Sequence, residues 1–198
     1  MASAVESSVM PLRHDGEVEV RFHGRGGMGA VVASQLLAQA AFLEGRWTQS
    51  FPFFGVERRG APVTAFTRIA AKPVEVRTNV YEPDVVVVLD AALAKGRGFL
   101  QGLRNGGTVV LNGRPDDEDR WDFPACVVDA TGIALEEGLG SRSVPIVNTA
   151  MVGALAGATD LVRLPSVLSA IEALVPQKLE ANQRAAERAA RAVRRVGS

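Results

Sequence analysis

His23-Gly24-Arg25-Gly26-Gly27-Met28-Gly29 is the stretch that decides the fold of this chain. The alternating residues 18–22 before it predict a strand, and the unbroken run 30–43 after it predicts a helix. A tight glycine turn between a strand and a helix exposes N–H groups at the helix N-terminus, which suits a phosphate. The spacing Gly24-x-Gly26-x-x-Gly29 fits the dinucleotide fingerprint, and Gly27 adds a fourth glycine. The same glycines suit a purely structural turn, so ligand contact and simple packing both remain open.

The composition is that of one α/β domain with no strong electrostatic preference. The chain has 198 residues, of which 47% are hydrophobic and 22% charged, enough for a substantial core. Lysine plus arginine equals aspartate plus glutamate, 22 each, so bulk charge directs the chain to neither nucleic acid nor membrane. No stretch resembles a signal peptide or a membrane-spanning helix, and we expect a reducing, cytoplasmic location.

Metal-binding residue types are scarce. Cys126 is the only cysteine and lies in an apolar run, so alone it holds no iron–sulfur cluster or zinc ion. We expect a buried, inert thiol rather than a reactive one. His14 and His23 are the only histidines, too few for a protein-borne metal site. The sequence therefore predicts no metal site and no catalytic residue on this chain.

The second half of the NAD fingerprint is missing. A dinucleotide-binding unit places an acid at the end of its second strand, about 20 residues past the glycines. Here that position is Gln49-Ser50, and the nearest acids are Glu44 and Glu57. This departure argues against a free-standing NAD-binding domain.

Residues 51–62 predict an irregular loop. The segment is Phe51-Pro52-Phe53-Phe54-Gly55-Val56-Glu57-Arg58-Arg59-Gly60-Ala61-Pro62 and follows no regular period. One interpretation is a loop whose aromatic side chains fold back on the core while its charges are solvated. We favour a binding loop, in which the arginines meet a phosphate or carboxylate and the aromatics meet a flat group or a partner surface.

The other segments predict a mixed sheet with short helices. Alternation at 63–69 and 74–78 across a turn predicts a hairpin, so the sheet is mixed rather than wholly parallel. The apolar run 84–90 predicts a central strand, and Asp90 at its end is expected to cap the next helix rather than bind a ligand. Further strands are expected at 17–22, 46–50, 108–111 and 125–129, and further helices at 91–103, 131–139, 148–158, 164–174 and 176–196.

Two of these helices have a distinctive composition. The helix at 148–158 is rich in alanine and glycine, which allows a close helix approach within the domain or against a partner. The helix at 176–196 becomes strongly basic, and we expect a solvated face rather than a nucleic-acid surface because aromatic residues are not interleaved. Thr131 is expected to cap the helix at 131–139, and 116–122 to form a charged surface loop.

With these residues placed, the pattern resembles the gamma subunit of pyruvate:ferredoxin oxidoreductase and related 2-oxoacid:acceptor oxidoreductases. The matching stretches span 17 to about 195 and are 23–29, 49–52, 54–63, 81–84 and 146–151. The string Glu57-Arg58-Arg59-Gly60-Ala61-Pro62 is far more specific than the glycine turn and looks most like the pyruvate-type subunits. The lead-in over 1–16 lies outside the resemblance and is expected to be loosely attached.

The resemblance implies a subunit of a larger enzyme. Such enzymes oxidatively decarboxylate a 2-oxoacid, here with pyruvate favoured, and join the acyl group to coenzyme A. The resemblance puts thiamine diphosphate, Mg²⁺ and 4Fe–4S clusters on partner subunits of the alpha, beta and delta types, with ferredoxin or a similar acceptor taking the electrons. It implies that the gamma subunit contributes to coenzyme A binding and packs against alpha.

Carried over by position, the resemblance implies three groups of site residues. They are the turn Gly24, Arg25, Gly26, Gly27, Met28 and Gly29, the loop Phe54, Gly55, Glu57, Arg58, Arg59 and Gly60, and Asn148. The expected fold is a three-layer α/β/α sandwich, Rossmann-like with a mixed sheet, in one domain over 17–198. Two alternatives remain open: a free-standing NAD- or flavin-binding oxidoreductase domain, and a purely structural assembly subunit.

Overall fold

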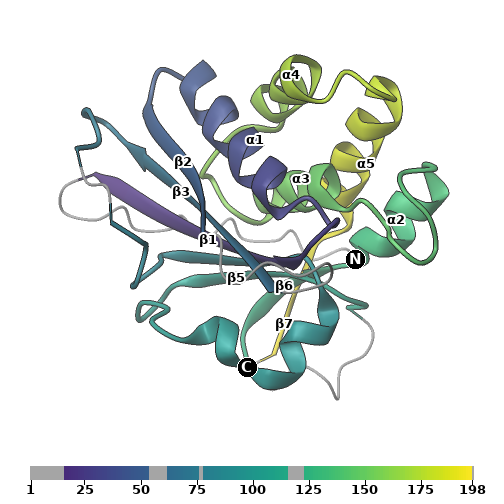
Figure 1. Ribbon diagram of the computed structural model, residues 1–198, viewed down its shortest axis with the longest axis horizontal. Coiled ribbons are helices and arrows are strands. Elements are labelled where there is room, and N and C mark those ends of the chain that lie inside the picture. Colours follow the sequence, from purple (N-terminus) through teal and green to yellow (C-terminus); the bar gives the residue numbers. More distant parts are fainter. Residues whose placement is uncertain (1–15, 54–61, 76–77, 116–122, 198) are drawn as a thin grey trace, which may run out of the picture.

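The computed structural model describes residues 16–53, 62–75, 78–115 and 123–197 (Figure 1). Their strands form one seven-stranded sheet in the order β2-β3-β1-β4-β5-β6-β7. β1, β4, β5 and β6 run parallel, whereas β3 lies antiparallel between β1 and β2, and β7 lies antiparallel on β6. The strands are β1 Glu17–Arg25, β2 Trp47–Phe53, β3 Pro62–Ala70, β4 Val85–Val88, β5 Thr108–Asn112, β6 Ala125–Val128 and β7 Arg194–Val196.

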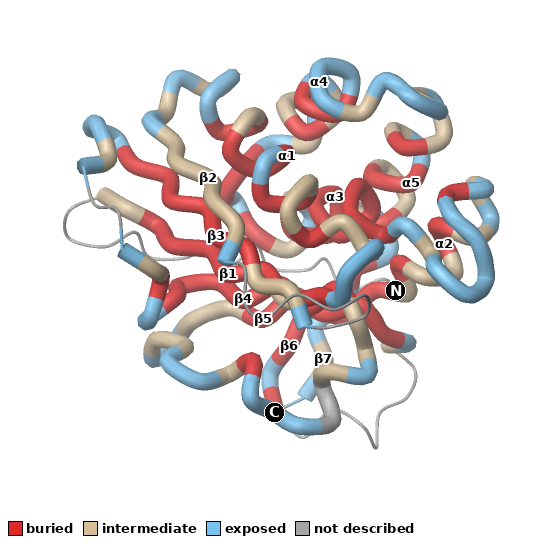
Figure 2. The backbone as a smooth tube through the Cα atoms, in the orientation of Figure 1, coloured by how far each residue is buried: buried red, intermediate tan, exposed pale blue. Residues whose placement is uncertain are grey.

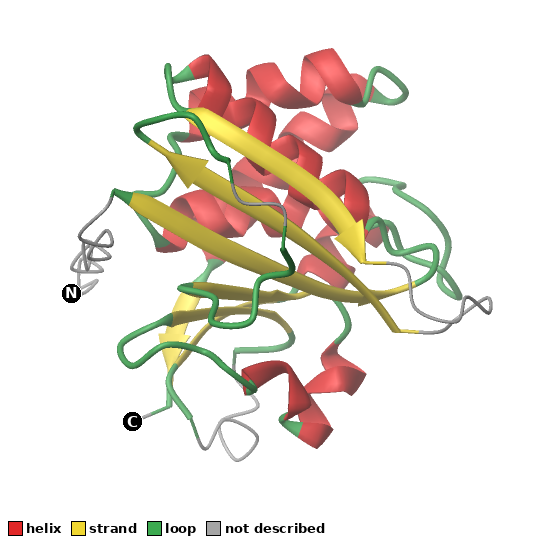
Figure 3. Ribbon diagram, turned by 60° about the vertical axis from the view of Figure 1, so that its left-hand side comes forward, coloured by secondary structure: helices red, strands yellow, loops and turns green. Residues whose placement is uncertain are grey.

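The two faces of the sheet are covered differently. All the described α-helices pack on one face (Figures 1 and 3). On the other face, two short 3₁₀ helices cover β4 to β6, η1 Ala91–Gly96 and η2 Gly98–Leu100. The α-helices are α1 Ala30–Leu43, α2 Ala130–Glu136, α3 Asn148–Ala158, α4 Leu164–Leu174 and α5 Leu179–Ala192. The expected α/β fold with a mixed sheet is confirmed, with 3₁₀ helices in the second outer layer.

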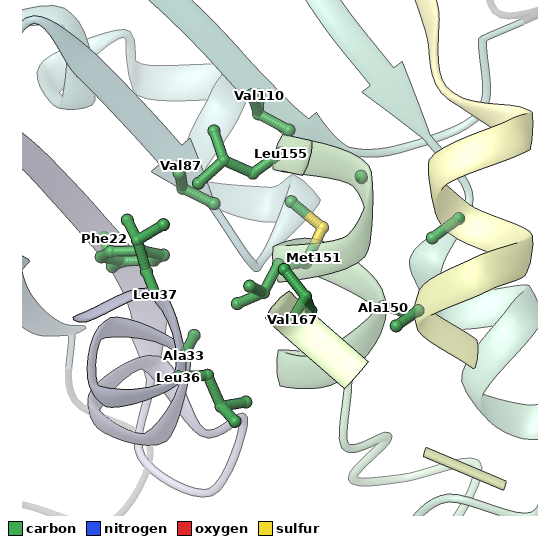
Figure 4. Close-up of a cluster of buried hydrophobic side chains, with 14 of the residues drawn as sticks. Phe22, Ala33, Leu36, Leu37, Val87, Val110, Ala150, Met151, Leu155 and Val167 are labelled. Atoms are coloured by element: carbon green, nitrogen blue, oxygen red, sulfur yellow. The ribbon is translucent and has the colours of Figure 1, made fainter. Parts of the chain in front are cut away.

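The main core lies between the sheet and the α-helices (Figures 2 and 4). Side chains alternate along β1, so Val18, Val20 and Phe22 enter this core. Because α3 is buried along eight consecutive residues from its start, it forms the centre of the helical layer. Figure 4 shows Met151 and Leu155 of α3 facing Val87 and Val110 of the sheet.

The small residues of α3 permit its close approach to α5. A Cβ added at Gly153 or Gly157 would fall on the backbone of Ala186 or Ala190. The sequence left open whether this helix packs inside the domain or against a partner. Contact with α5 shows that at least the glycine side packs inside the domain.

The opposite face of β1 and β3 buries a charged network. Arg68 is 1% exposed, and its Nε donates a hydrogen bond of 2.8 Å to Glu19 Oε1. Its terminal nitrogens donate to Gln49 Oε1 and to the carbonyl oxygen of Thr78, and its guanidinium lies 5.2 Å from the centre of the Phe51 ring. Buried charge is tolerated here because it is paired and fully hydrogen-bonded.

Two strand predictions are wrong: one strand is longer than expected, and another is not a strand in its described residues. β2 continues to Phe53, whereas the sequence suggested that it ends at Ser50, because Phe51 to Phe53 pair with Phe66 to Thr64 of β3. The expected hairpin partner at 74–78 is not a strand in its described residues, and β3 pairs instead with β1 and β2. The sheet is mixed for this different reason.

Three helix expectations also need correction. The segment 91–103 forms 3₁₀ turns rather than an α-helix, because Arg97 between Gly96 and Gly98 adopts a left-handed φ of 48°. Asp90 caps η1 through its hydrogen bond from the Ala92 N–H. Asp129, not Thr131, caps α2. α5 ends at Ala192, and the expected helical continuation is strand β7. The predicted loop at 116–122 and the lead-in at 1–15 lie outside the described residues.

Candidate functional site

The carboxyl ends of β1 and β4 form a topological switch point. These strands are adjacent and parallel, yet β1 leads into α1 on the helical face while β4 leads into η1 on the opposite face. Open α/β sheets bind ligands where consecutive connections diverge in this way. We call this place the switch point, comprising His23 to Gly29 and Leu89 to Asp90.

The glycine turn is built partly by pairing and partly by packing. Gly24 and Arg25 are the last residues of β1, which the sequence placed in the turn, and Arg25 pairs with Pro62 of β3. Gly24 is closely packed, since an added Cβ would lie 3.3 Å from that of Ala30 and would need a small shift of its neighbour. The Met28 N–H donates to the carbonyl oxygen of Arg25 at 3.1 Å and closes the turn.

Positive φ angles explain two more glycines. Gly27 has a φ of 99° and Gly29 one of 83°, a region that only glycine enters freely. Gly26 and Gly27 are exposed, so backbone polar groups of the turn are accessible to a ligand. The structural interpretation therefore accounts for Gly24, Gly27 and Gly29, while the exposure of Gly26 and Gly27 leaves room for ligand contact.

Two helix N-termini meet at the turn. α1 begins after Gly29 and α3 begins at Asn148, and neither N-cap residue provides a side-chain cap, while Asn148 Oδ1 accepts from the Thr149 N–H at 2.8 Å. An added Cβ on Gly29 would lie 2.7 Å from Asn148 Nδ2, so the two helix starts are in contact. The structure thus brings Asn148 to the glycine turn, 119 positions away in sequence. Uncapped helix starts with no acid in the first turn attract anions.

Arg25 does not offer a free charge to a ligand. Its Nε lies 2.6 Å from Asp90 Oδ2, and the arginine side chain is 47% exposed while the aspartate is 17% exposed. The sequence favoured a capping role for Asp90 over a place in a ligand crevice, and the structure adds this ion pair across the switch point. Arg25 therefore reaches an anion only with a neighbouring carboxylate to offset it.

His23 is held by a buried arginine beneath it. Arg21 is 9% exposed, and its Nε donates a hydrogen bond of 2.9 Å to His23 Nε2. One terminal nitrogen of Arg21, Nη2, donates to the carbonyl oxygens of Phe99 and Gln101. Burial, and secondly the charge of Arg21, lower the pKa of His23 to about 4. His23 is consequently a neutral side chain at neutral pH.

The predicted loop residues Phe54, Gly55, Glu57, Arg58, Arg59 and Gly60 lie outside the described residues. Their described neighbours, Phe53 and Pro62, lie at the carboxyl end of β1, since Phe53 pairs with Thr64 and Pro62 with Arg25. Both ends of the segment thus start from the switch-point edge of the sheet. On the other side of the turn, Val144 contacts the Gly27 position and is 43% exposed.

The sheet order explains why the NAD fingerprint is incomplete. In a dinucleotide-binding fold the strand that follows the first helix lies beside the first strand and carries the ribose-binding acid. Here β3 lies between β1 and β2, so the tip of β2 is two strand spacings, about 10 Å, from the glycine turn. That tip is Phe51-Pro52-Phe53, with no carboxylate.

The described part of the chain contains no group of three or more potential metal-ligating side chains. Cys126 is buried, and burial raises the pKa of its thiol. None of the helices in this part has the length and apolar character needed to cross a bilayer.

A cavity of about 670 Å³ opens between the amino ends of β5 and β6, at the edge opposite the switch point.

Sequence reasoning missed three polar contributors near the switch point. Arg21 and His23 are two apart on a strand, which places them on the same face, and this alternation was the available signal. Asn112 at the end of β5 donates to the carbonyl oxygen of Leu89 and to Thr131 Oγ1, holding the ends of β4 and β5 to α2. No spacing in the sequence predicted that bridge.

Comparison with known proteins gives a consistent family signal. The family model described as pyruvate ferredoxin/flavodoxin oxidoreductase matches residues 19–192. The pyruvate/ketoisovalerate oxidoreductases common subunit gamma of Thermococcus kodakarensis is 53% identical over 179 residues, which cover 87% of this chain and 95% of that protein. Pyruvate synthase subunit PorC of Methanocaldococcus jannaschii is 54% identical over 171 residues, covering 86% and 93%.

Solved structures share the fold. Pyruvate oxidoreductase subunit PORC of Thermotoga maritima superposes with a TM-score of 0.77 at 39% identity, covering 91% of this chain and 98% of that one. 2-Oxoglutarate:ferredoxin oxidoreductase of Magnetococcus marinus, with 2-oxoglutarate, coenzyme A and succinyl-CoA bound, has a TM-score of 0.70 at 18% identity. The match covers 88% of this chain but 30% of that one, so there the fold is part of a longer polypeptide.

Proposed function

This chain belongs to the pyruvate ferredoxin/flavodoxin oxidoreductase family, as a gamma subunit of a pyruvate or 2-oxoacid ferredoxin oxidoreductase, and on that premise we propose that it binds coenzyme A at the switch point. The complex oxidatively decarboxylates a 2-oxoacid and transfers the acyl group to coenzyme A. The gamma subunit also contributes to assembly with its partner subunits. Pyruvate is the favoured 2-oxoacid, in keeping with the names of the relatives above 50% identity.

One observation carries the coenzyme A proposal. The exposed glycine turn lies where the uncapped starts of α1 and α3 meet, and both helices place the positive ends of their dipoles there. Coenzyme A brings three phosphate groups, which match such a place better than an uncharged ligand. The missing acid on β2 removes the usual ribose contact of NAD but none that a phosphate needs.

The site residues have different roles in this proposal. Gly26, Gly27 and Met28 present backbone groups to a phosphate, while Gly24 and Gly29 shape the turn. Asn148 sets the distance between the two helix starts. The segment with Phe54, Gly55, Glu57, Arg58, Arg59 and Gly60 supplies further cationic and aromatic contacts to coenzyme A or to the alpha subunit.

Electron transfer and decarboxylation belong to the partner subunits in this proposal. With a single, buried cysteine, this chain does not fit an iron–sulfur cluster, which needs several thiolates. Thiamine diphosphate, Mg²⁺ and 4Fe–4S clusters are accordingly assigned to the alpha, beta and delta-type subunits. Ferredoxin or a similar protein takes the electrons, and the complex works in the cytoplasm.

Thermal unfolding of the chain with and without coenzyme A tests the proposal. A ligand at 100 times its Kd stabilises the folded state by about 2.7 kcal/mol, which raises the Tm of a chain of this size by roughly 5–10 °C. NADH at the same concentration should give no shift. A shift with NADH and none with coenzyme A would instead revive the nucleotide-binding oxidoreductase alternative.

A pair of arginine variants locates the binding place. Arg25→Ala leaves the Asp90 carboxylate unopposed at the switch point, so coenzyme A affinity should fall about five- to thirtyfold, for roughly 1–2 kcal/mol. Arg163→Ala is the matched control, an exposed arginine paired with Glu44 at the far end of α1. Equal affinities of the two variants in calorimetric titrations would place the ligand elsewhere.

Copurification tests the assembly part of the proposal. A tagged chain isolated from its own cells should bring thiamine diphosphate-binding and iron-containing subunits, identified by mass spectrometry and iron analysis. If the partners copurify but coenzyme A binds neither the chain nor the complex through this subunit, the chain is a structural assembly subunit.

A further inference from the structure

We propose that Arg21 and His23 form a relay that presents the His23 Nδ1–H as a hydrogen-bond donor to a phosphate oxygen of the ligand. The inference rests on the proposed coenzyme A function and deepens it by naming a recognition residue outside the glycine turn. It treats His23 as a binding residue and Arg21 as a positioning residue that acts through it.

Arg21 is held in place by its hydrogen bonds. Its side chain lies on the face of β1 opposite the α-helices and is 9% exposed. One terminal nitrogen, Nη2, donates to the carbonyl oxygens of Phe99 at 2.9 Å and Gln101 at 2.5 Å, so η2 and the following residue hold the guanidinium. Only Nε is then directed along the strand to His23.

The hydrogen bond from Arg21 determines the tautomer of His23. A guanidinium carries only donors, so the atom that meets Arg21 Nε at 2.9 Å must be an acceptor. His23 Nε2 is therefore unprotonated, and the neutral imidazole carries its proton on Nδ1. The ring accepts from a charged donor on one side and donates on the other, which polarises the Nδ1–H and strengthens it as a donor.

The Nδ1–H of His23 has no protein partner in the described part of the chain. Arg21 provides the one side-chain hydrogen bond of His23 there, and none of the buried side-chain nitrogen or oxygen atoms described lacks a partner. His23 Nδ1 is accordingly open to solvent rather than sealed in the sheet. It lies on the residue immediately before Gly24, two positions before the last residue of β1.

The polarised Nδ1–H of His23 is therefore suited to an anionic oxygen as its acceptor. The relay brings the influence of a buried positive charge to the surface without an exposed flexible cation. The neighbouring Arg25 is already paired with Asp90, so the relay supplies positive character that this ion pair does not. Hydrogen bonds with an ionised partner are shorter and stronger than neutral ones. A phosphate oxygen of coenzyme A is the acceptor of that class in the proposed ligand.

Nitrogen NMR of the full chain tests the tautomer. Long-range proton–nitrogen correlation spectra distinguish protonated from bare imidazole nitrogens, and a His14→Gln variant leaves His23 as the single histidine. The proposal expects Nδ1 protonated and Nε2 bare at neutral pH, and a shift of Nδ1–H on addition of coenzyme A. An Nε2–H tautomer, or no response to saturating coenzyme A, would overturn the relay.

Two substitutions then separate recognition from structure. Gln at 23 keeps an acceptor for Arg21 near the Nε2 position but has no donor at the Nδ1 position, whereas Asn has an amide near Nδ1 and cannot reach Arg21. His23→Gln should fold normally and bind coenzyme A and ADP at least tenfold more weakly. His23→Asn should be less stable yet keep affinity within about threefold. If His23→Gln binds as tightly as the parent, the relay is refuted while the coenzyme A function stands. Failure of the parent chain to bind coenzyme A refutes both.

Discussion

Lowering the pH from 7 to 4.5 should destabilise this protein by about 2.5 kcal/mol through His23 alone. Burial and the adjacent Arg21 lower the pKa of His23 from 6.5 to about 4. In the unfolded chain the imidazole takes up a proton below pH 6.5, whereas in the folded protein it stays neutral down to about pH 4. The unfolded state therefore binds more protons between these values, and stability falls as the pH falls.

The magnitude follows from the size of this gap. A difference of about 2.5 units corresponds to roughly 3 kcal/mol when the full window is crossed, at about 1.36 kcal/mol per unit. At pH 4.5 most of it has been lost. Domains of this kind have roughly 5–15 kcal/mol in total, so one side chain accounts for a substantial share. Glu44 and Glu137, whose pKa values are lowered, lose their contributions only below their ordinary value of 4.5.

Urea unfolding at pH 7, 5.5 and 4.5 measures the effect, with His23→Gln as the reference. The variant keeps an acceptor for Arg21 but has no titrating ring, so its stability should change far less between these pH values. His14 and the carboxylates are common to both proteins and cancel in the difference. Parallel pH dependences of the parent and the variant would show that His23 is protonated equally in the folded and unfolded states, and the reasoning would fail.

Three further outcomes are expected. Gly153→Ala should cost about 1–3 kcal/mol in urea unfolding, because its Cβ would meet the α5 backbone. Gly96→Ala, with open space around it, should be nearly neutral, and equal costs would contradict the packing argument. Arg68→Met should cost roughly 3–5 kcal/mol, because it removes the guanidinium that the buried Glu19 carboxylate and the Thr78 carbonyl oxygen contact. A loss under about 1 kcal/mol in the same assay would contradict this prediction. Asp90→Asn keeps an acceptor for the η1 cap but releases Arg25 from its ion pair, so coenzyme A affinity measured by calorimetry should rise severalfold. A fall in affinity would mean that the aspartate itself contributes to binding the ligand.

The sequence was sufficient where one physical effect dominated. The apolar runs of β4 and β5 and the boundaries of α1, α3 and α4 agree with the structure. Burial decides the two strands, and the positive-φ glycines Gly29 and Gly45 flank α1. It was insufficient where tertiary pairing overrode local pattern. The alternation at 74–78 suggested a strand, but β3 uses both of its edges for β1 and β2, so no edge is left for a hairpin partner.

The candidate site was also predictable only where a local pattern carried the information. The glycine spacing indicated a turn suited to phosphate, but only the resemblance connected it with Asn148, and the structure shows the contact. The ion pair of Arg25 with Asp90 joins two strand ends that lie far apart in the chain, which no local period reveals. The pair Arg21 and His23 was accessible from alternation, yet a strand with charged residues on one face is ordinarily taken to be half solvated.

The two borders of the sheet limit how this subunit can join others. β2 forms one border and carries Pro52, which has no N–H to offer a further strand. β7 forms the other with three residues, two of them exposed arginines. Short, charged or proline-bearing outer strands discourage the growth of a sheet from one molecule into the next. In a gamma subunit of a larger oxidoreductase complex, such borders therefore lower the tendency towards fibrous self-association.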